Sequence, residues 1–191
     1  MARPRHYINH VGPGELGFFT TTALDFAHLF CREEMREAMT WLLLNHLLTS
    51  KATLHAFVVM KHHIHFVARM PQTQHGNEFV QELKRSSALT LKPLLLPEEV
   101  DQLKQQTGLN RHTFWKRSYR SVPIYTEALL EQKIAYTHAN PVKKEYVDNA
   151  RDYRWSSAWA LEREDLVGEN YQLRLEPLRN EFKPPPTSMP Q

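Results

Sequence analysis

Three closely spaced histidines, His62, His63 and His65, lie in the second half of an apolar stretch at residues 54–69, LHAFVVMKHHIHFVAR. Its β-branched, aromatic and other apolar residues predict strand structure that is buried on both faces. Because successive side chains of a strand point to opposite faces, His63 and His65 share one face. Two adjacent imidazoles suit a divalent metal, which would accept one nitrogen from each ring. The spacing alone favours a simpler interpretation, in which the two histidines are hydrogen-bonded on a half-exposed face. A metal site becomes the better interpretation only if the rest of the chain supplies a third ligand and a group that could react.

Tyr136 and Asn140 are the residues that could complete such a site, and they lie late in the chain on a predicted helix at residues 126–140. Thr126 is a suitable N-cap, and Pro141 is expected to end the helix because the residue before a proline resists the α conformation. Residues four apart stack on one helical face. If that face covers the histidine pair, the Asn140 amide oxygen can bind the metal and the Tyr136 hydroxyl can reach a substrate group bound there.

A basic and aromatic segment, RHTFWKRSYR at residues 111–120, lies just before this helix and contains no acidic residue. Cations interleaved with aromatic rings suit single-stranded nucleic acid, because the cations bind phosphates and the rings stack on bases. The alternative is a strand whose aromatic side chains pack inward and whose cations are solvated. The candidate DNA contacts in this segment are Arg111, Trp115, Lys116, Arg117, Tyr119 and Arg120, and those outside it are Arg3, Arg5, Lys84 and Arg85.

The elements that must position these residues follow from hydrophobic periodicity and turn signals. Strands are predicted at residues 17–24, 54–60, 64–69 and 113–119, the second and third forming a hairpin around Lys61 and His62. Helices are predicted at residues 32–48, 78–91 and 126–140. This order predicts an α+β fold, a ferredoxin-like antiparallel sheet with helices packed mainly on one face.

Length and composition narrow the classes of protein further. The 191 residues suit one domain with extensions: a basic arm at 1–16, a domain at 17–160 that holds the candidate catalytic residues, and a C-terminal extension at 161–191 whose Pro-rich end is expected to be disordered. The single cysteine, Cys31, excludes an intramolecular disulfide and a zinc finger, and fits a reducing cytoplasm. No run of apolar residues is long enough for a membrane-spanning helix, and the first residues lack the apolar core of a secretory signal. The net charge of +3 is a mild bias toward nucleic acid.

Four segments together carry a resemblance to a known family. GFFTTTAL, AFVVMKHHIHFVAR, FWKRSYRS and IAYTHANPVKKEYVDNARDYRWSSA occur in this order between Gly17 and Ala158. They resemble the REP-associated tyrosine transposases, single-tyrosine transposases within the HUH single-strand nuclease superfamily. The most distinctive element is Asn140-Pro141-Val142, which follows four residues after the tyrosine.

The resemblance implies a function and a role for each site residue. His63 and His65 correspond to the HUH histidines, Tyr136 to the nucleophile, and Asn140 to the helix position that completes coordination of Mg²⁺ or Mn²⁺. The family cleaves single-stranded DNA at the foot of short palindromic hairpins and becomes joined to the 5′ end through a phosphotyrosine. The implied partner is therefore hairpin-forming DNA and not a membrane, bound by a monomer or a homodimer. The alternative is a non-catalytic hairpin-binding protein that keeps the same fold.

The chain departs from the family pattern at three places. Lys61-His62 stands where the family commonly has Pro-Asn or Pro-Glu, Lys144-Glu145-Tyr146 replaces a small-residue turn, and Arg120-Ser121-Val122 replaces an acidic residue paired with histidine. By strand alternation His62 is expected on the face opposite His63, as a surface or packing residue. Tyr119 is a rival nucleophile, but a tyrosine in a basic strand more often stacks or packs.

Overall fold

The computed structural model describes residues 10–24, 27–101, 114–168 and 172–186. Its strands are β1 (Leu16–Thr22), β2 (Thr53–Val59), β3 (His63–Arg69) and β4 (Arg120–Pro123). Its α-helices are α1 (Glu33–Ser50), α2 (Gly76–Leu91), α4 (Glu127–Lys143) and α5 (Leu175–Asn180). Short 3₁₀ helices follow α2 and α4: η2 (Lys92–Leu94), η3 (Ala150–Asp152) and η4 (Ser157–Ala160).

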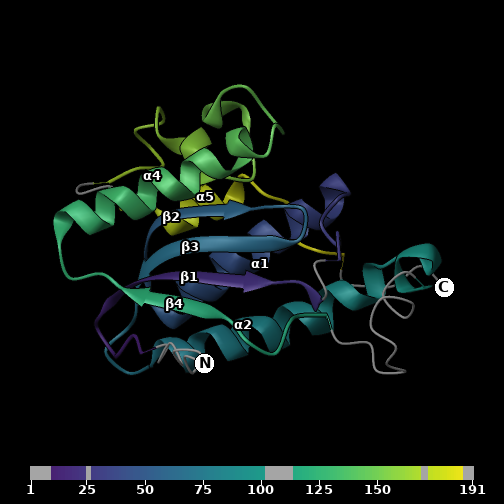
Figure 1. The fold of residues 1–191 in the computed structure, drawn as a ribbon, viewed down its shortest axis with the longest axis horizontal. Helices are drawn as coiled ribbons and strands as arrows, with labels where there is room; N and C mark the ends of the chain where they lie inside the picture. Colours follow the sequence, from purple (N-terminus) through teal and green to yellow (C-terminus); the bar gives the residue numbers. More distant parts are fainter. Residues whose placement is uncertain (1–9, 25–26, 102–113, 169–171, 187–191) are drawn as a thin grey trace, which may run out of the picture.

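The strands form one four-stranded sheet in the order β2-β3-β1-β4, in which every neighbouring pair is antiparallel (Figure 1). With the chain order β1-α1-β2-β3-α2-β4, this is the ferredoxin-like topology. The β2–β3 hairpin is confirmed, and β1 pairs with β3 so that Thr20 lies opposite His65. The predicted α+β fold is confirmed.

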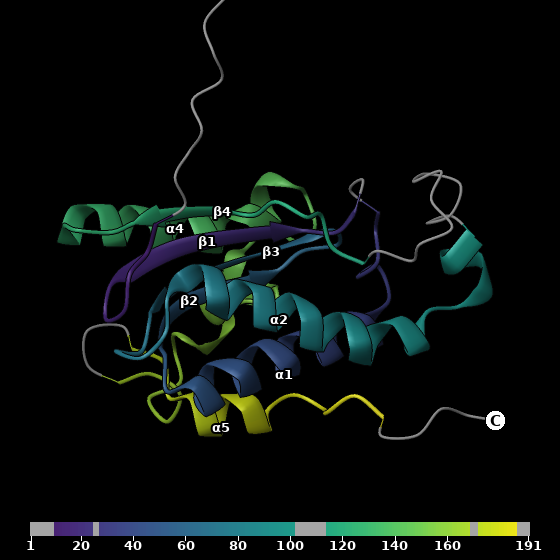
Figure 2. The same cartoon turned by 90° about the horizontal axis from the view of Figure 1, so that it is seen from below.

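Helices cover both faces of the sheet in unequal number. In Figure 2 the sheet separates α4 from α1 and α2, and α5 lies beyond, against α1. Strand alternation explains the division, because Phe19 and Phe66 pack in the large core with α1 and α2. Phe18 and Val67, on the opposite face of the same strands, pack in a smaller cluster beneath α4. The face under α4 is also the one to which His63 and His65 belong.

The basic and aromatic segment does not form the strand expected at residues 113–119. Trp115 makes only an isolated bridge with Ala23, and the regular strand β4 begins at Arg120. The neighbours Phe114 and Trp115 are both buried in the large core, at 1% and 4% exposure. Two successive residues of a regular strand cannot both point to one face, so burying both requires an irregular backbone.

Helix α4 begins as predicted but ends later. The hydroxyl of Thr126 accepts a hydrogen bond from the backbone N–H of Leu129 at 3.2 Å, which confirms the N-cap. The prediction that Pro141 ends the helix is wrong, because α4 continues through it to Lys143. A proline so near the end removes one backbone donor, and the last turn is closed by the N–H of Lys144 on the Asn140 carbonyl, at 3.1 Å.

The hydrophobic core extends beyond the predicted catalytic domain at both ends. Val11 precedes β1 and is 1% exposed, while Leu178 on α5 and Phe182 after it are 0% and 3% exposed. All three belong to the large core formed with α1 and α2. Residues 1–9 of the expected basic arm and residues 187–191 of the Pro-rich end lie outside the described residues. No helix in the described part of the chain is long and apolar enough to span a membrane.

Candidate active site

A cleft of about 880 Å³ lies between α4 and the strands β1, β3 and β4. It contains the four residues predicted to carry chemistry, His63, His65, Tyr136 and Asn140, which come from two distant parts of the chain. The sheet and α4 therefore bring together the two pairs that the sequence placed on separate elements. The remaining lining residues are Phe18, Thr20, Thr22, His62, Lys116, Ser118, Tyr119, Arg120, Val122, Lys133 and Lys144.

The two predicted metal-binding histidines are neighbours in this cleft. Their ring centroids are 4.6 Å apart, and both side chains are buried. Burial, together with the adjacent imidazole of His62, lowers the pKa of His63 to about 3. Burial and the neighbouring histidines also hold the pKa of His65 well below its ordinary value. Both rings are therefore neutral at neutral pH, which is the form that binds metals.

Thr20 on β1 orients the His65 ring, a contact that sequence reasoning missed. Its hydroxyl lies 2.8 Å from His65 Nδ1, across the paired strands β1 and β3. With Nδ1 occupied, Nε2 is the ring nitrogen that remains for a ligand. The sequence offers little indication of this contact, because threonine is common in strands for its β propensity alone.

Tyr136 projects from α4 beside the histidines. Its ring is 5.4 Å from the His65 ring and 5.7 Å from the Phe18 ring, which it meets edge to face. The side chain is 41% exposed, the most open of the four predicted site residues. The phenol is therefore both close to the histidine pair and accessible to a large substrate.

Asn140 lies one turn further along α4 and is 7% exposed. Its Nδ2 donates a hydrogen bond to the Tyr136 carbonyl at 2.7 Å, which leaves the amide oxygen as an acceptor for a ligand. Within the described ranges, no group of three or more His, Cys, Asp or Glu side chains could hold a metal ion. Two neutral imidazoles and one amide oxygen nevertheless form a donor set compatible with a divalent cation.

The prediction that His62 lies on the face opposite His63 is wrong, because this residue also lines the cleft. It lies in the turn between β2 and β3, and its ring is 4.5 Å from that of His63 and 5.3 Å from that of His28. The regular strand begins only at His63, so the alternation of side chains does not extend to the residue before it. Burial is also the main cause of its lowered pKa.

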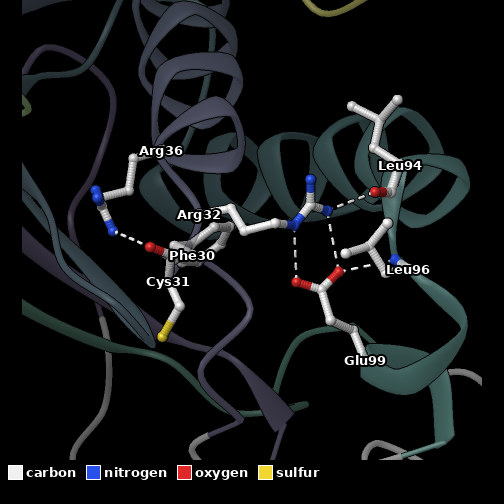
Figure 3. Close-up of polar contacts among 7 residues, drawn as sticks. All are labelled: Phe30, Cys31, Arg32, Arg36, Leu94, Leu96 and Glu99. Carbon is white, nitrogen blue, oxygen red and sulfur yellow. Dashed lines mark hydrogen bonds and ion pairs between the residues drawn. The ribbon is translucent and has the colours of Figure 1, made fainter.

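The turn that carries His62 is held by the segment preceding α1. The backbone N–H of Ala23 donates to the His62 carbonyl at 2.8 Å, and that of Phe30 to the Lys61 carbonyl at 3.0 Å. Arg36, buried on α1, donates in turn to the Phe30 carbonyl at 2.6 Å (Figure 3). These contacts fix the position of the histidine hairpin, and nothing in the local sequence pattern indicated them.

Only part of the predicted DNA-binding set faces the cleft. Lys116, Tyr119 and Arg120 line it, and burial raises the pKa of the half-buried Tyr119, which makes it a poorer nucleophile. Arg85 and Arg117 are exposed but do not line the cleft. Arg3, Arg5 and Arg111 lie outside the described residues.

Two members of the predicted DNA-binding set, Trp115 and Lys84, make hydrogen bonds within the protein instead. The prediction that Trp115 stacks on DNA is wrong, because its ring is buried and its Nε1 donates to the Ser87 hydroxyl at 3.0 Å. Lys84 donates from Nζ to the backbone carbonyls of Lys116 and Arg117. Burial lowers the pKa of Lys84. This lysine therefore fixes the segment that carries the cleft cations, a role that depends on tertiary contacts.

Comparisons with known proteins agree with this architecture. Residues 27–150 match the family described as "Transposase IS200 like", which is more than half of the chain. A solved structure of a REP-associated tyrosine transposase bound to a REP hairpin has a TM-score of 0.58 and 18% identity, over 85% of this chain and 87% of that one. A putative transposase from Deinococcus radiodurans R1 has a TM-score of 0.46 and 19% identity, over 72% of this chain and 98% of that one. No curated protein matches. The family match, with a shared fold, leads to one conclusion: the chain belongs to the IS200-like transposase family.

Proposed function

We propose that this transposase-family protein is a metal-dependent single-stranded DNA endonuclease and strand transferase that cleaves at hairpin-forming repeats. The observation that carries the proposal is a single cleft containing His63, His65, Asn140 and Tyr136, lined by cations and, within the described residues, by no Asp or Glu. The hairpin substrate is supported by the similar solved structure, a REP-associated tyrosine transposase bound to a REP hairpin.

The charge of the cleft suits a polyanion. Its cations are Lys116, Arg120, Lys133 and Lys144. If each contacts one phosphate, the logarithm of the binding constant falls with the logarithm of salt concentration at a slope near −3, from about −0.7 per contact for single strands. The half-buried Tyr119 and the partly exposed Tyr136 add aromatic surface for unpaired bases.

In this proposal His63, His65 and Asn140 hold Mg²⁺ or Mn²⁺. The bound ion would act as a Lewis acid that neutralises phosphate charge and orients the scissile group. Thr20 fixes the orientation of the His65 ring through Nδ1, and burial keeps both imidazoles unprotonated. The Asn140 side chain is fixed through its contact with the Tyr136 carbonyl, so ligand and nucleophile share one turn of α4.

Tyr136 performs the covalent step. Its phenolic oxygen attacks the phosphorus, a new O–P bond forms, and the bond from phosphorus to the 3′ oxygen of the preceding nucleotide breaks. The phenol loses its proton and the departing 3′ oxygen gains one, so the step releases a 3′-hydroxyl and leaves the 5′ phosphate on the tyrosine. Because the phosphodiester energy is retained in this bond, a second 3′-hydroxyl can reverse the step and join strands.

The test is formation of a covalent adduct that survives SDS. The protein is incubated with Mn²⁺ and a panel of DNA hairpins with single-stranded flanks, each labelled at either the 3′ or the 5′ end. Only the 3′ label is expected to migrate with the protein, and EDTA is expected to prevent the adduct while hairpin binding persists. Tyr136→Phe should abolish the adduct, and Tyr125→Phe, at a side chain 76% exposed outside the cleft, should leave it unchanged.

Two outcomes would contradict parts of the proposal. An adduct in Tyr136→Phe that disappears in Tyr119→Phe would move the nucleophile to the basic segment. Hairpin binding without an adduct in either Mg²⁺ or Mn²⁺, across the whole panel, would favour the non-catalytic hairpin-binding protein.

A further inference from the structure

We propose that Lys133 is a further catalytic residue, whose ammonium binds a non-bridging oxygen of the scissile phosphate from the α4 side of the cleft. The inference rests on the proposed function and assigns a role that neither the histidine motif nor the tyrosine helix motif contains. It was absent from the candidates that the sequence suggested, because a lone lysine on a helix is ordinarily solvated.

Lys133 lies beside the Phe18 ring, which also contacts the rings of His65 and Tyr136. Its Nζ lies 5.2 Å from the centroid of the Phe18 ring and 6.0 Å from that of Tyr136. The same Phe18 ring stacks on His65 with a centroid distance of 5.3 Å and an interplanar angle of 24°. The ammonium, the nucleophile and one metal-binding histidine therefore surround a single phenylalanine that is 5% exposed.

The helix places Lys133 and Tyr136 on the same side of α4. Residues three apart are neighbours on a helical surface, and both side chains line the cleft. The hydroxyl of Thr137 donates to the Lys133 carbonyl at 2.7 Å, which adds a contact to the turn that joins them. A phosphate that contacts the Tyr136 phenol would therefore also lie near the Lys133 side chain.

The charge of Lys133 meets no acidic partner in the described parts of the chain. Among the described residues, no carboxylate pairs with its ammonium, and none lines the cleft. A ring face attracts a cation through its quadrupole but carries no net charge. The ammonium of the half-buried Lys133 is therefore available to attract an anion that enters the cleft.

This placement suits the charge that develops during cleavage. When the phenolic oxygen attacks, negative charge increases on the non-bridging oxygens of the phosphate until the bond to the 3′ oxygen breaks. A fixed N–H donor aimed at one of these oxygens stabilises the transition state without transferring a proton. The proton balance of the step is unchanged, because the phenol still loses one proton and the 3′ oxygen still gains one.

Lys143 provides a matched control on the same helix. Its Nζ lies 5.3 Å from the centroid of the Tyr136 ring, so it is as near the nucleophile as Lys133 is. It differs in being exposed and outside the cleft lining. A general electrostatic effect on the tyrosine would involve both lysines, whereas contact with the scissile phosphate requires the one inside the cleft.

The first experiment measures the single-turnover rate of adduct formation at saturating hairpin DNA and Mn²⁺. Lys133→Met is expected to slow the step about 100-fold, the range found when one preorganised charge-stabilising donor is removed. Lys133→Arg is expected to restore part of the rate, and Lys143→Met to stay within about 2-fold of the wild type. Equal losses in the two methionine variants, or a full rate in Lys133→Met, would overturn the role.

The second experiment removes the charge from the DNA. A methylphosphonate at the cleaved linkage, tested as each stereoisomer, replaces one non-bridging oxygen with a methyl group. The stereoisomer lacking the oxygen that Lys133 binds should be cleaved slowly by the wild type and by Lys133→Met at rates within about 5-fold of each other. An undiminished 100-fold difference on both stereoisomers would mean that the lysine acts elsewhere. Absence of any wild-type adduct on normal DNA would overturn the proposed function itself, a result distinct from a wild-type adduct with a fully active Lys133→Met.

Discussion

The candidate ligand His65 is defined by the residues around its ring. Thr20 occupies Nδ1, Phe18 stacks on one side of the imidazole, and the His63 ring lies 4.6 Å away. Each of these neighbours comes from β1 or β3, so pairing of the two strands is what assembles the ring's surroundings. Removing a partner that orients a metal-binding histidine typically weakens metal affinity by about 10- to 100-fold.

Replacing Thr20 with valine tests this contact, because the change keeps the shape and removes the hydroxyl. We expect the Mn²⁺ concentration needed for half-maximal adduct formation to rise about 10- to 100-fold. Thr21→Val is the control, since the Thr21 hydroxyl is buried on the other face without a hydrogen-bond partner among the described residues. The control should keep the Mn²⁺ dependence and leave stability equal or slightly higher. An unchanged Mn²⁺ requirement in Thr20→Val would show that the contact does not orient a ligand.

Trp115 gives a second prediction at the residue scale. Trp115→Phe removes the hydrogen bond to Ser87 and part of a buried ring, so the free energy of unfolding should fall by about 1–3 kcal/mol in urea denaturation. Hairpin affinity should stay within about 2-fold of the wild type. A large loss of affinity at unchanged stability would instead restore the base-stacking role.

At the scale of elements, the end of β2 is held by the chain that follows α4. The Tyr153 hydroxyl donates to the Val59 carbonyl at 2.8 Å, and the Val59 N–H donates to the Trp155 carbonyl at 2.9 Å. The hydroxyl of Ser157 accepts from the Phe57 N–H at 2.9 Å. The segment after the tyrosine helix therefore completes the edge of the sheet beside the histidine hairpin.

Tyr153 also predicts how stability depends on alkaline pH. Burial raises the pKa of Tyr153 above its ordinary value near 10, so the folded protein keeps a proton that the unfolded chain loses. The unfolded state then binds fewer protons, and the free energy of unfolding falls as the pH rises above about 10. Tyr153→Phe should lower the free energy of unfolding by about 1 kcal/mol at pH 8. Above about pH 10, the free energy of unfolding of this variant should fall less steeply with rising pH than that of the wild type.

Urea denaturation at a series of pH values between 8 and 11 measures both effects. Tyr125→Phe is the matched control, because this tyrosine is 76% exposed and should show the wild-type slope. Identical slopes in Tyr153→Phe and the wild type would show that the buried phenol does not contribute to alkaline unfolding.

At the scale of the whole molecule, the chain forms successive layers: α4, the sheet, α1 with α2, and α5 (Figure 2). The site lies between the first two layers, and the large core lies beneath the sheet. Because α5 contributes to that core, the C-terminal extension helps to stabilise the sheet that carries the histidines.

Leu178→Ala tests whether α5 is part of the folding unit. The side chain is fully buried, so its truncation should lower the free energy of unfolding by about 2–5 kcal/mol. Leu89→Ala, at a leucine that is 68% exposed on α2, should change it by no more than about 0.5 kcal/mol. Similar small effects in both variants would place α5 outside the cooperative core.

The local periodicity of the sequence was enough to predict most of the fold. Strand alternation correctly gave His63 and His65 a common face, and helical spacing correctly stacked Tyr136 with Asn140. The N-cap at Thr126 and the order of strands and helices also depend on residues close together in the chain. Such features are set by backbone geometry, which repeats over a few residues and can be read from their order.

Contacts between distant segments decided the rest. The crossing of α4 over the sheet joins the two pairs into one cleft, and it also brings Lys133 to Phe18. The placement of His62 in the cleft, Trp115 in the core and Lys84 against backbone carbonyls likewise depends on which surfaces meet. A side chain's own neighbours in the sequence do not specify those surfaces, because burial and hydrogen bonding are settled when the elements pack together.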